Sequence, residues 1–285
     1  MRRFSADYLE RTRRGMWESR EALAPLDLAG RQRVLDAGCG TGELTRVLAE
    51  EAPQAAVVGV DADRDLLASA RRASTDADRD GATDADRDTP SRIDYAAGDA
   101  TRLPFPDDAF DLVVCQALLI NLPDPAAAVR EFARVSSGLV AAVEPDNADV
   151  DVSSTVDAEA GLEARVREAY IAGVETDVAM GDRVRDLFAD AGLSDVRARR
   201  YRHEKRVDPP YSQADLTGIT RKASGAGLAD HEPELRRALD GGDGGGYDDL
   251  RNRWREMGRE AARQARDREY ERVERVPFDV TVGRV

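Results

Sequence analysis

The sequence predicts a doubly wound α/β fold, in which a mostly parallel sheet carries helices on both faces. Short apolar runs alternate with helical patterns across residues 33–144, and alternation of this length implies a parallel sheet. The run Ala55–Asp61 is apolar almost throughout, as expected for a strand that is covered on both faces. At 285 residues, the chain is long enough to bury a substantial core.

The first elements follow from apolar spacing. Residues 1–30 are expected to be helical, because apolar residues recur among many charges. Arg33–Asp36 is the first predicted strand, and Gly42–Glu51 is a helix with its apolar residues on one face. After the second strand, Asp63–Ala73 is predicted as a helix whose first residue, Asp63, serves as its N-cap.

A repeated hexamer interrupts this pattern. T-D-A-D-R-D occurs at Thr75–Asp80 and again at Thr83–Asp88. Neither copy has an apolar residue larger than alanine, so Thr75–Asp88 is expected to be a disordered insertion. Alternating aspartates are also found in calcium loops, but the required glycine and closing glutamate are missing, and no metal site is predicted.

Five more strands and several helices complete the predicted fold. The N-terminal half continues with strands at Ile93–Ala97, Phe110–Cys115 and Leu139–Glu144 and a helix at Pro125–Val135. The C-terminal half is predicted to contain helices at Ala158–Gly173 and Asp182–Gly192, a strand at Asp195–Arg202, a flexible break at Gly241–Gly246, a long helix along Leu250, Trp254, Met257 and Ala261, and a strand at Pro277–Val282. These elements predict a helical segment 1–30, a binding core 31–150, and a region 151–285 with a helical lid and two strands.

Charge and composition restrict the setting and the partners. The net charge is −14, and Lys205 and Lys222 are the only lysines, a pattern that resembles proteins of salt-loving microbes. No apolar run approaches the length of a membrane helix, and the N-terminus lacks the apolar core of a secretory signal. With only Cys39 and Cys115, a reducing, cytoplasmic location is expected. The acid excess also argues against a nucleic-acid partner.

The segment Val34–Leu44, V-L-D-A-G-C-G-T-G-E-L, places glycines at alternate positions between a strand and a helix. A phosphate-binding loop is excluded because no lysine is near. A dinucleotide loop needs a third glycine where this chain has Glu43, a carboxylate that would repel a pyrophosphate. The remaining pattern, D-x-G-x-G-x-G, has glycines at Gly38 and Gly40 that let a ligand approach the main chain closely.

In these and later motifs the sequence resembles the class I S-adenosylmethionine-dependent methyltransferases, close to the group that includes the ubiquinone and menaquinone biosynthesis enzymes. The matching motifs occur in order over about Arg33–Asn147: V-L-D-A-G-C-G-T-G, V-V-G-V-D-A, G-D-A-T-R-L-P-F, F-D-L-V-V-C and N-L-P-D-P-A-A-A-V-R-E-F-A-R-V. The resemblance implies a Rossmann-like, seven-stranded sheet with an antiparallel last strand, S-adenosylmethionine as cofactor, and a small-molecule methyl acceptor.

The resemblance also implies roles for particular residues. Asp36 is expected to orient the cationic methionine end of the cofactor, and Asp61 to accept hydrogen bonds from the ribose hydroxyls. Asp99 is expected to hold the adenine amino group, and the main chain of Ala100 a ring nitrogen. Further contacts are assigned to loop residues and strand ends: Gly38, Cys39, Gly40, Ala62, Cys115 and Gln116.

The acceptor half of the site is less defined. Many relatives have a histidine near N-L-P-D-P, where this chain has Ile120 and Asn121. Glu144, at the end of the fifth strand, is the best candidate for a general base, although a structural role is the alternative. Tyr8 and Arg11 are candidates to close over the methionine carboxylate, with packing as the alternative.

Two other functions stay open. One is a non-catalytic regulator that binds S-adenosylmethionine. The other is amino methylation of a nucleic acid or protein, because D-P-P-Y occurs at Asp208–Tyr211. This tetrapeptide comes after the predicted sixth strand instead of the fourth, so a loop is the preferred interpretation.

Overall fold

A computed structural model describes residues 5–13, 15–81, 92–240 and 245–285, with the side chains of residues 10, 11 and 77–81 left out. Contacts divide the chain into two compact units. Unit 1 comprises Met1–Pro145, Met180–Tyr201 and Phe278–Val285, and unit 2 comprises Asp146–Ala179 and Arg202–Pro277. The region predicted at 151–285 is therefore shared between the units. Among the described residues, no helix is long and apolar enough to span a membrane.

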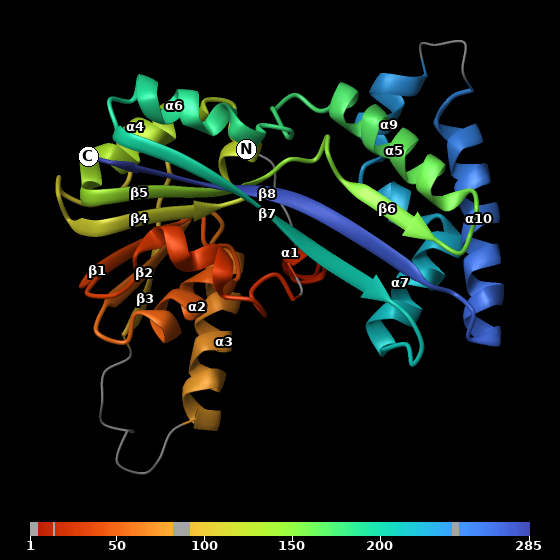
Figure 1. Cartoon of the computed structure of the whole chain (residues 1–285), viewed down its shortest axis with the longest axis horizontal. Helices are drawn as coiled ribbons and strands as arrows, with labels where there is room; N and C mark the ends of the chain where they lie inside the picture. Colours follow the sequence, from red (N-terminus) through yellow and green to blue (C-terminus); the bar gives the residue numbers. More distant parts are fainter. Residues whose placement is uncertain (1–4, 14, 82–91, 241–244) are drawn as a thin grey trace. The chain divides into compact units, whose positions relative to one another are not determined.

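Unit 1 is a doubly wound α/β structure (Figure 1). Its parallel strands lie in the order β3-β2-β1-β4-β5, with bounds β1 Arg33–Ala37, β2 Ala56–Asp61, β3 Ile93–Ala97, β4 Phe110–Gln116 and β5 Ser136–Pro145. The C-terminal part of β8 (Arg272–Arg284) pairs antiparallel with β5, and β7 (Ser194–Val207) pairs with β8. The expected antiparallel last strand is confirmed.

Helices cover both faces of this sheet because successive strand residues alternate between two apolar clusters. Val34 packs on one face with α2 (Glu43–Glu51) and η1 (Glu21–Leu26). Leu35 packs on the other face with α4 (Pro125–Val135) and α6 (Val184–Asp190). The remaining helical elements of unit 1 are α1 Ala6–Arg13, α3 Arg64–Gly81, η2 Leu119–Asn121 and η3 Gly181–Arg183.

Two sequence expectations need correction here. The first 30 residues are not one helix, since α1 ends at Arg13 and η1, which contains Pro25, is a separate turn. The first hexamer copy, Thr75–Asp80, is helical because α3 continues to Gly81, so the expectation of disorder is wrong for it. A helix that has already formed is extended at one hydrogen bond per residue, and Thr75 donates its hydroxyl to the carbonyl of Arg71. The second copy lies outside the described residues.

Unit 2 consists of helices and short stretches of sheet. Its elements are β6 Asp151–Ser154, α5 Glu159–Gly173, α7 Gln213–Ser224, α8 Ala226–Ala229, α9 Glu232–Leu239 and α10 Tyr247–Asp267. β6 pairs antiparallel with the first residues of β8 and makes an eighth strand where seven were predicted. The predicted α10 stripe, including Leu250 and Trp254, is buried in the apolar cluster of this unit.

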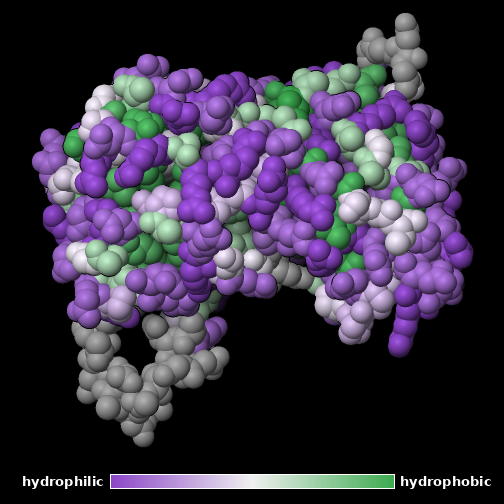
Figure 2. Space-filling view, in the orientation of Figure 1, coloured by the Kyte–Doolittle hydropathy of each residue, from purple (hydrophilic) through white to green (hydrophobic). Residues whose placement is uncertain are grey.

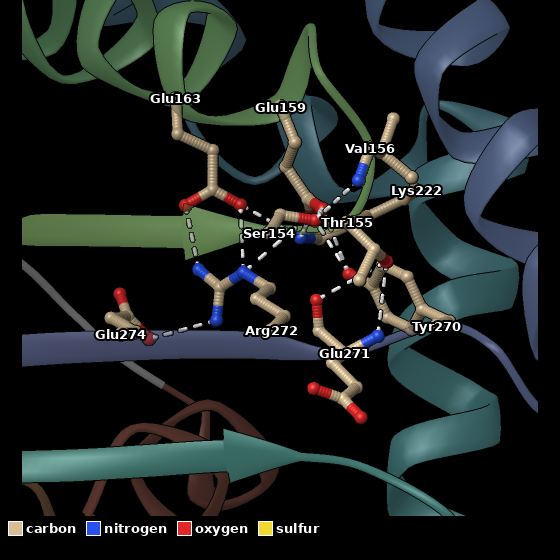
Figure 3. A network of polar contacts seen from close by, with 10 residues as sticks. All are labelled: Ser154, Thr155, Val156, Glu159, Glu163, Lys222, Tyr270, Glu271, Arg272 and Glu274. Carbon is tan, nitrogen blue, oxygen red and sulfur yellow. Dashed lines mark hydrogen bonds and ion pairs between the residues drawn. The ribbon is translucent and has the colours of Figure 1, made fainter.

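A buried network of charges joins α5, α7 and β8 inside unit 2 (Figure 3). Glu159 is fully buried and accepts hydrogen bonds from Lys222 and from the Tyr270 hydroxyl. Glu163 accepts from Lys222 at 2.7 Å and from Arg272 at 2.6 Å. Burial alone would raise the pKa of Glu163, but the two cations outweigh it and lower that pKa to about 2. The network therefore consists of paired charges, which is how buried charges are tolerated.

The surface is hydrophilic, as the composition implies. Figure 2 shows polar side chains over most of the visible face, with apolar ones only in small groups. Leu216 and Val285 are the large apolar side chains that are more than a third exposed among the described residues. Apolar material is thus concentrated in the clusters inside each unit.

Candidate functional site

The glycine loop follows β1 and leads into α2, at the carboxyl ends of the parallel strands. The N–H groups of Gly38 and Cys39 donate to the carbonyl of Val60, which ties the loop to the end of β2. Gly38 has φ of +73°, a conformation that favours glycine, and a Cβ there would lie 2.7 Å from Leu118. The loop is therefore pressed against the turn that follows β4. In open α/β sheets, ligands bind outside this edge.

Asp61 shapes the loop from the end of β2. Its Oδ2 accepts from the Gly40 N–H at 2.8 Å, and its Oδ1 accepts from the Asp63 N–H at 2.8 Å. Each oxygen of a carboxylate can accept a second hydrogen bond, so this buried side chain can still receive a donor from a ligand. Ala62, beside it, is exposed. Asp63 caps α3 as predicted, accepting from the Asp65 N–H at 2.9 Å.

Asp36 is a buried carboxylate with one hydrogen-bonded oxygen and one without a partner. Its Oδ2 accepts from the Thr45 hydroxyl at 2.6 Å, while its Oδ1 is buried without a hydrogen-bond partner among the described residues. Burial raises the pKa of Asp36 to about 6, although Thr45 and the charge of Arg13 oppose the shift. A buried, unsatisfied carboxylate oxygen is unfavourable and suits a cationic ligand group.

Arg13 is the residue of this site that sequence analysis missed. It is 8% exposed at the end of α1, and its Nη1 lies 3.4 Å from where a Cβ of Gly40 would stand. Leu9, one turn earlier, approaches the same point at 3.0 Å. Leu9 is one of the apolar residues that recur in segment 1–30, so its i+4 neighbour on the same face could have been identified from the sequence. The predicted Tyr8 is half-buried on α1, and the Arg11 side chain lies outside the described residues.

The predicted adenine contacts lie after β3. Asp99 is exposed, and its Oδ1 accepts from the main chain and the hydroxyl of Thr101 at 2.9 and 2.8 Å. These bonds lower the pKa of Asp99, so the side chain is a carboxylate. Ala100 is buried beside it. This geometry is that of a turn aspartate, in which Oδ1 makes both hydrogen bonds.

The end of β4 supplies the remaining predicted residues. The carbonyl of Gln116 accepts from Arg13 at 3.5 Å, and its side-chain Nε2 lies 2.8 Å from the sulfur of Met16. Cys115 is fully buried, and burial raises the pKa of its thiol well above the ordinary value. A protonated, enclosed thiol is a poor nucleophile. Cys39 is also buried with a raised pKa.

Glu144, the candidate base, has both carboxylate oxygens engaged. Its Oε1 accepts from the N–H groups of Leu118 and Leu119 at 3.0 and 2.9 Å, and its Oε2 accepts from Ile120 at 3.4 Å. The side chain is fully buried, and burial raises its pKa to about 7 against these hydrogen bonds. A base must reach the proton that it removes. The geometry therefore favours the structural alternative.

Asp208 of the D-P-P-Y segment lies in unit 2, while the glycine loop lies in unit 1. Tyr211 donates its hydroxyl to the carbonyl of Tyr270 at 3.0 Å, so the aromatic ring of the tetrapeptide is held within unit 2. Among the described residues, no cluster of His, Cys, Asp and Glu side chains could hold a metal ion.

Comparisons with known proteins match the segment that contains the glycine loop. Residues 35–141 match the Methyltransferase domain family. The chain is 26% identical over 196 residues to demethylmenaquinone methyltransferase of Shouchella clausii, covering 64% of this chain and 79% of the relative. It is 33% identical over 142 residues to trans-aconitate 2-methyltransferase of an Azoarcus species, covering 49% of this chain and 48% of the relative.

The structural comparison extends over nearly the whole chain. The YcgJ protein of Bacillus subtilis has a TM-score of 0.54 at 18% identity, covering 93% of this chain and 98% of that protein, which establishes a shared fold. Six further curated relatives are each matched over 38–49% of their own length.

The fold, the glycine loop and the acidic strand ends define a class I methyltransferase domain, whose cofactor is S-adenosylmethionine. Residues 35–141, which contain the glycine loop and the ends of β1, β2 and β4, are the part of the chain that matches the Methyltransferase domain family.

Proposed function

We propose that this protein transfers the methyl group of S-adenosylmethionine to a small-molecule acceptor. The observation that carries the proposal is the free Oδ1 of buried Asp36 beside the glycine loop, together with the Arg13 guanidinium close to Gly40 of the same loop. A carboxylate and a guanidinium beside one close-approach loop suit the amino and carboxylate groups of a methionine tail.

The residues of unit 1 divide the work of holding the cofactor. Asp36 would accept from its amino group and Arg13 would donate to its carboxylate. Asp61 would accept from ribose hydroxyls with the acceptor positions that Gly40 and Asp63 leave open. Asp99 and the Ala100 main chain would bind the adenine, as the family resemblance implies, and Tyr8 stays a candidate contact at α1.

When bound, S-adenosylmethionine supplies an activated methyl group on a sulfonium. The protein then has to align the acceptor and keep water away, and such positioning can contribute on the order of 7–11 kcal/mol. Glu144 would act on the main chain and not as the base, given its enclosed carboxylate. An acceptor that loses a proton would then need another group or water to receive it.

The acceptor class rests on the relatives. Their names specify demethylmenaquinone and trans-aconitate, both small molecules. The net charge of −14 supports the same proposal, because it disfavours a polyanion such as nucleic acid. We further propose that the protein is located in a reducing, salt-rich cytoplasm. Its two buried free cysteines, its acid excess and the predominance of arginine over lysine support this location.

The first test is titration calorimetry with S-adenosylhomocysteine. The second measures the formation of S-adenosylhomocysteine from S-adenosylmethionine in the presence of a panel of quinols, carboxylates and amines. Binding together with acceptor-dependent release supports the proposal. Binding without formation of S-adenosylhomocysteine in the presence of any acceptor favours the non-catalytic regulator. No binding contradicts both functions.

A matched pair of variants makes the test specific. Gly38→Ala should abolish binding, because it combines a strained φ with a clash against Leu118. Gly30→Ala has φ of +85° with nothing within 4 Å of the added Cβ, so it carries the backbone strain alone and should bind normally.

A further inference from the structure

The turn that follows β4 has an unusual requirement for hydrogen-bond acceptors. β4 ends at Gln116, and Ala117 has φ of +48°, a conformation that is strained for alanine. The next N–H groups belong to Leu118, Leu119 and Ile120, at the start of the 3-10 turn η2. The first N–H groups of a helical turn have no partner within that turn. All three residues are buried, so water does not satisfy them.

One side chain provides all the acceptors. Glu144 lies at the end of β5, one residue beyond the Gln116–Val143 pair of the parallel ladder, and so reaches across to the turn. Its carboxylate accepts from all three N–H groups and also from the Cys115 thiol, with 3.7 Å between Sγ and Oε1. The carboxylate thus serves as an internal anion for the main chain of the turn.

The same turn touches the cofactor loop at two points. The Leu118 side chain packs on Gly38, closely enough that a Cβ at Gly38 could not fit. The carbonyl of Gln116, at the base of the turn, accepts from Arg13. A shift of the turn would therefore displace both the floor of the glycine loop and the guanidinium beside it.

We propose that Glu144 is a positioning residue, whose carboxylate fixes the turn of residues 117–121 so that Leu118 holds the glycine loop in its cofactor-binding form. This inference rests on the proposed cofactor site, but its central statement concerns the turn itself. Only the charged carboxylate offers acceptors to three N–H groups and a thiol at once, since a protonated carboxyl uses one oxygen as a donor.

Other ionisable groups surround Glu144, and their titration has to be distinguished from that of Glu144. Cys115 faces it from β4, and Asp279 is its partner across the antiparallel pairing with β8. Asp279 is held by Arg200 of β7 at 2.8 Å. Asp36, on β1, acts on the same thiol and has its own pKa of about 6.

The first test observes the turn without any ligand. The main-chain N–H resonances of Leu118, Leu119 and Ile120 should shift together with a midpoint near pH 7, which is the pKa of Glu144. In Glu144→Gln the three signals should no longer follow that transition. Signals that do not titrate near pH 7 in the wild type, or that titrate unchanged in Glu144→Gln, would overturn the proposal whatever the protein catalyses.

The second test links the turn to the cofactor. The dissociation constant of S-adenosylhomocysteine should weaken about tenfold from pH 8 to pH 6 through Glu144, and Glu144→Gln should keep only the component near pH 6 that belongs to Asp36. If Glu144→Gln does not fold, Leu118→Ala decides the question: it should weaken binding severalfold and retain the transition of the N–H signals. Wild-type affinity in Leu118→Ala would overturn the link, and failure of the wild type to bind would instead contradict the proposed function.

Discussion

Arg13, at the end of α1, donates a hydrogen bond to the main-chain carbonyl of Gln116, at the end of β4, across 103 residues of sequence. This 3.5 Å contact is long for a hydrogen bond, and it is the only hydrogen bond that the described residues give to the buried Arg13 guanidinium. A buried charge that is so weakly satisfied has capacity for an anionic ligand.

Arg13→Ala should weaken binding of S-adenosylhomocysteine by about 1.5–3 kcal/mol, because a charge-assisted hydrogen bond is lost. It should also raise the pKa of Asp36 further, since the charge of Arg13 lowers it. Calorimetry of the variant would measure the first effect. Arg20→Ala is the control, because Arg20 pairs with exposed Glu50 away from the loop and its loss should leave the affinity unchanged. Unchanged affinity in Arg13→Ala would remove Arg13 from the site.

Asp61→Asn and Asp63→Ala should separate binding from stability. Asparagine has one acceptor oxygen, so it cannot serve Gly40, Asp63 and a ribose together, and binding should weaken by about 1.5–3 kcal/mol. Asp63→Ala removes the cap of α3 and should reduce the free energy of unfolding by about 1 kcal/mol while the affinity stays the same. The two variants are compared by calorimetry and urea unfolding. Equal effects of both on binding would contradict the assignment of Asp61.

Asp36→Asn should stabilise the protein while it impairs binding. Because burial raises the folded pKa of Asp36 to about 6 from an ordinary 3.8, the folded state holds this proton more tightly than the unfolded state. Stability from this group is therefore complete below about pH 3.8 and declines as pH rises through 6.

Above pH 6 the wild type carries a penalty on the order of 3 kcal/mol, which Asp36→Asn should remove because asparagine can still accept from Thr45. Urea unfolding at pH 7.5 and pH 4.5 should show a gain at the higher pH that shrinks at the lower one. A variant that is less stable at pH 7.5 would show that the carboxylate is satisfied in the apo protein.

Lys222→Met should reduce the free energy of unfolding by about 3–5 kcal/mol, because it leaves fully buried Glu159 without its closest cation. The double variant Glu159→Gln/Lys222→Met should recover much of this loss, since no unpaired charge remains. Arg263→Ala, which breaks an exposed pair with Glu260, is the surface control and should change the melting temperature little. A single variant as stable as the surface control would indicate that water reaches Glu159.

The parallel strands could be predicted because each is an apolar run that pairs with parallel neighbours. β1, β2 and β4 therefore lie close to their expected bounds. β6, by contrast, reads D-V-S-S and has one apolar residue, so only its pairing with β8 makes it a strand. β7 extends to Val207 through a run rich in arginine for the same reason.

The motifs of the proposed cofactor site could be recognised from sequence because the glycines and Asp36 occur at fixed positions around one strand–turn–helix, and Asp61 ends the next strand. Contacts between side chains that are far apart in the sequence could not be predicted. Lys222 and Glu159 are 63 residues apart, and nothing local in either segment indicates their contact. The function of Glu144 was ambiguous for a related reason: its partners are main-chain groups, which every residue has.

The order of the segments of the two units along the chain affects how such a protein can evolve. The proposed cofactor residues, from Tyr8 to Gln116, lie in one uninterrupted segment of unit 1, and unit 2 begins only afterwards, at Asp146. Segments 180–201 and 278–285 then return to complete the sheet of unit 1. The helices of unit 2 are thus two insertions into an otherwise finished domain. A lineage could replace them, and with them whatever they recognise, without altering a single position of the inherited cofactor segment.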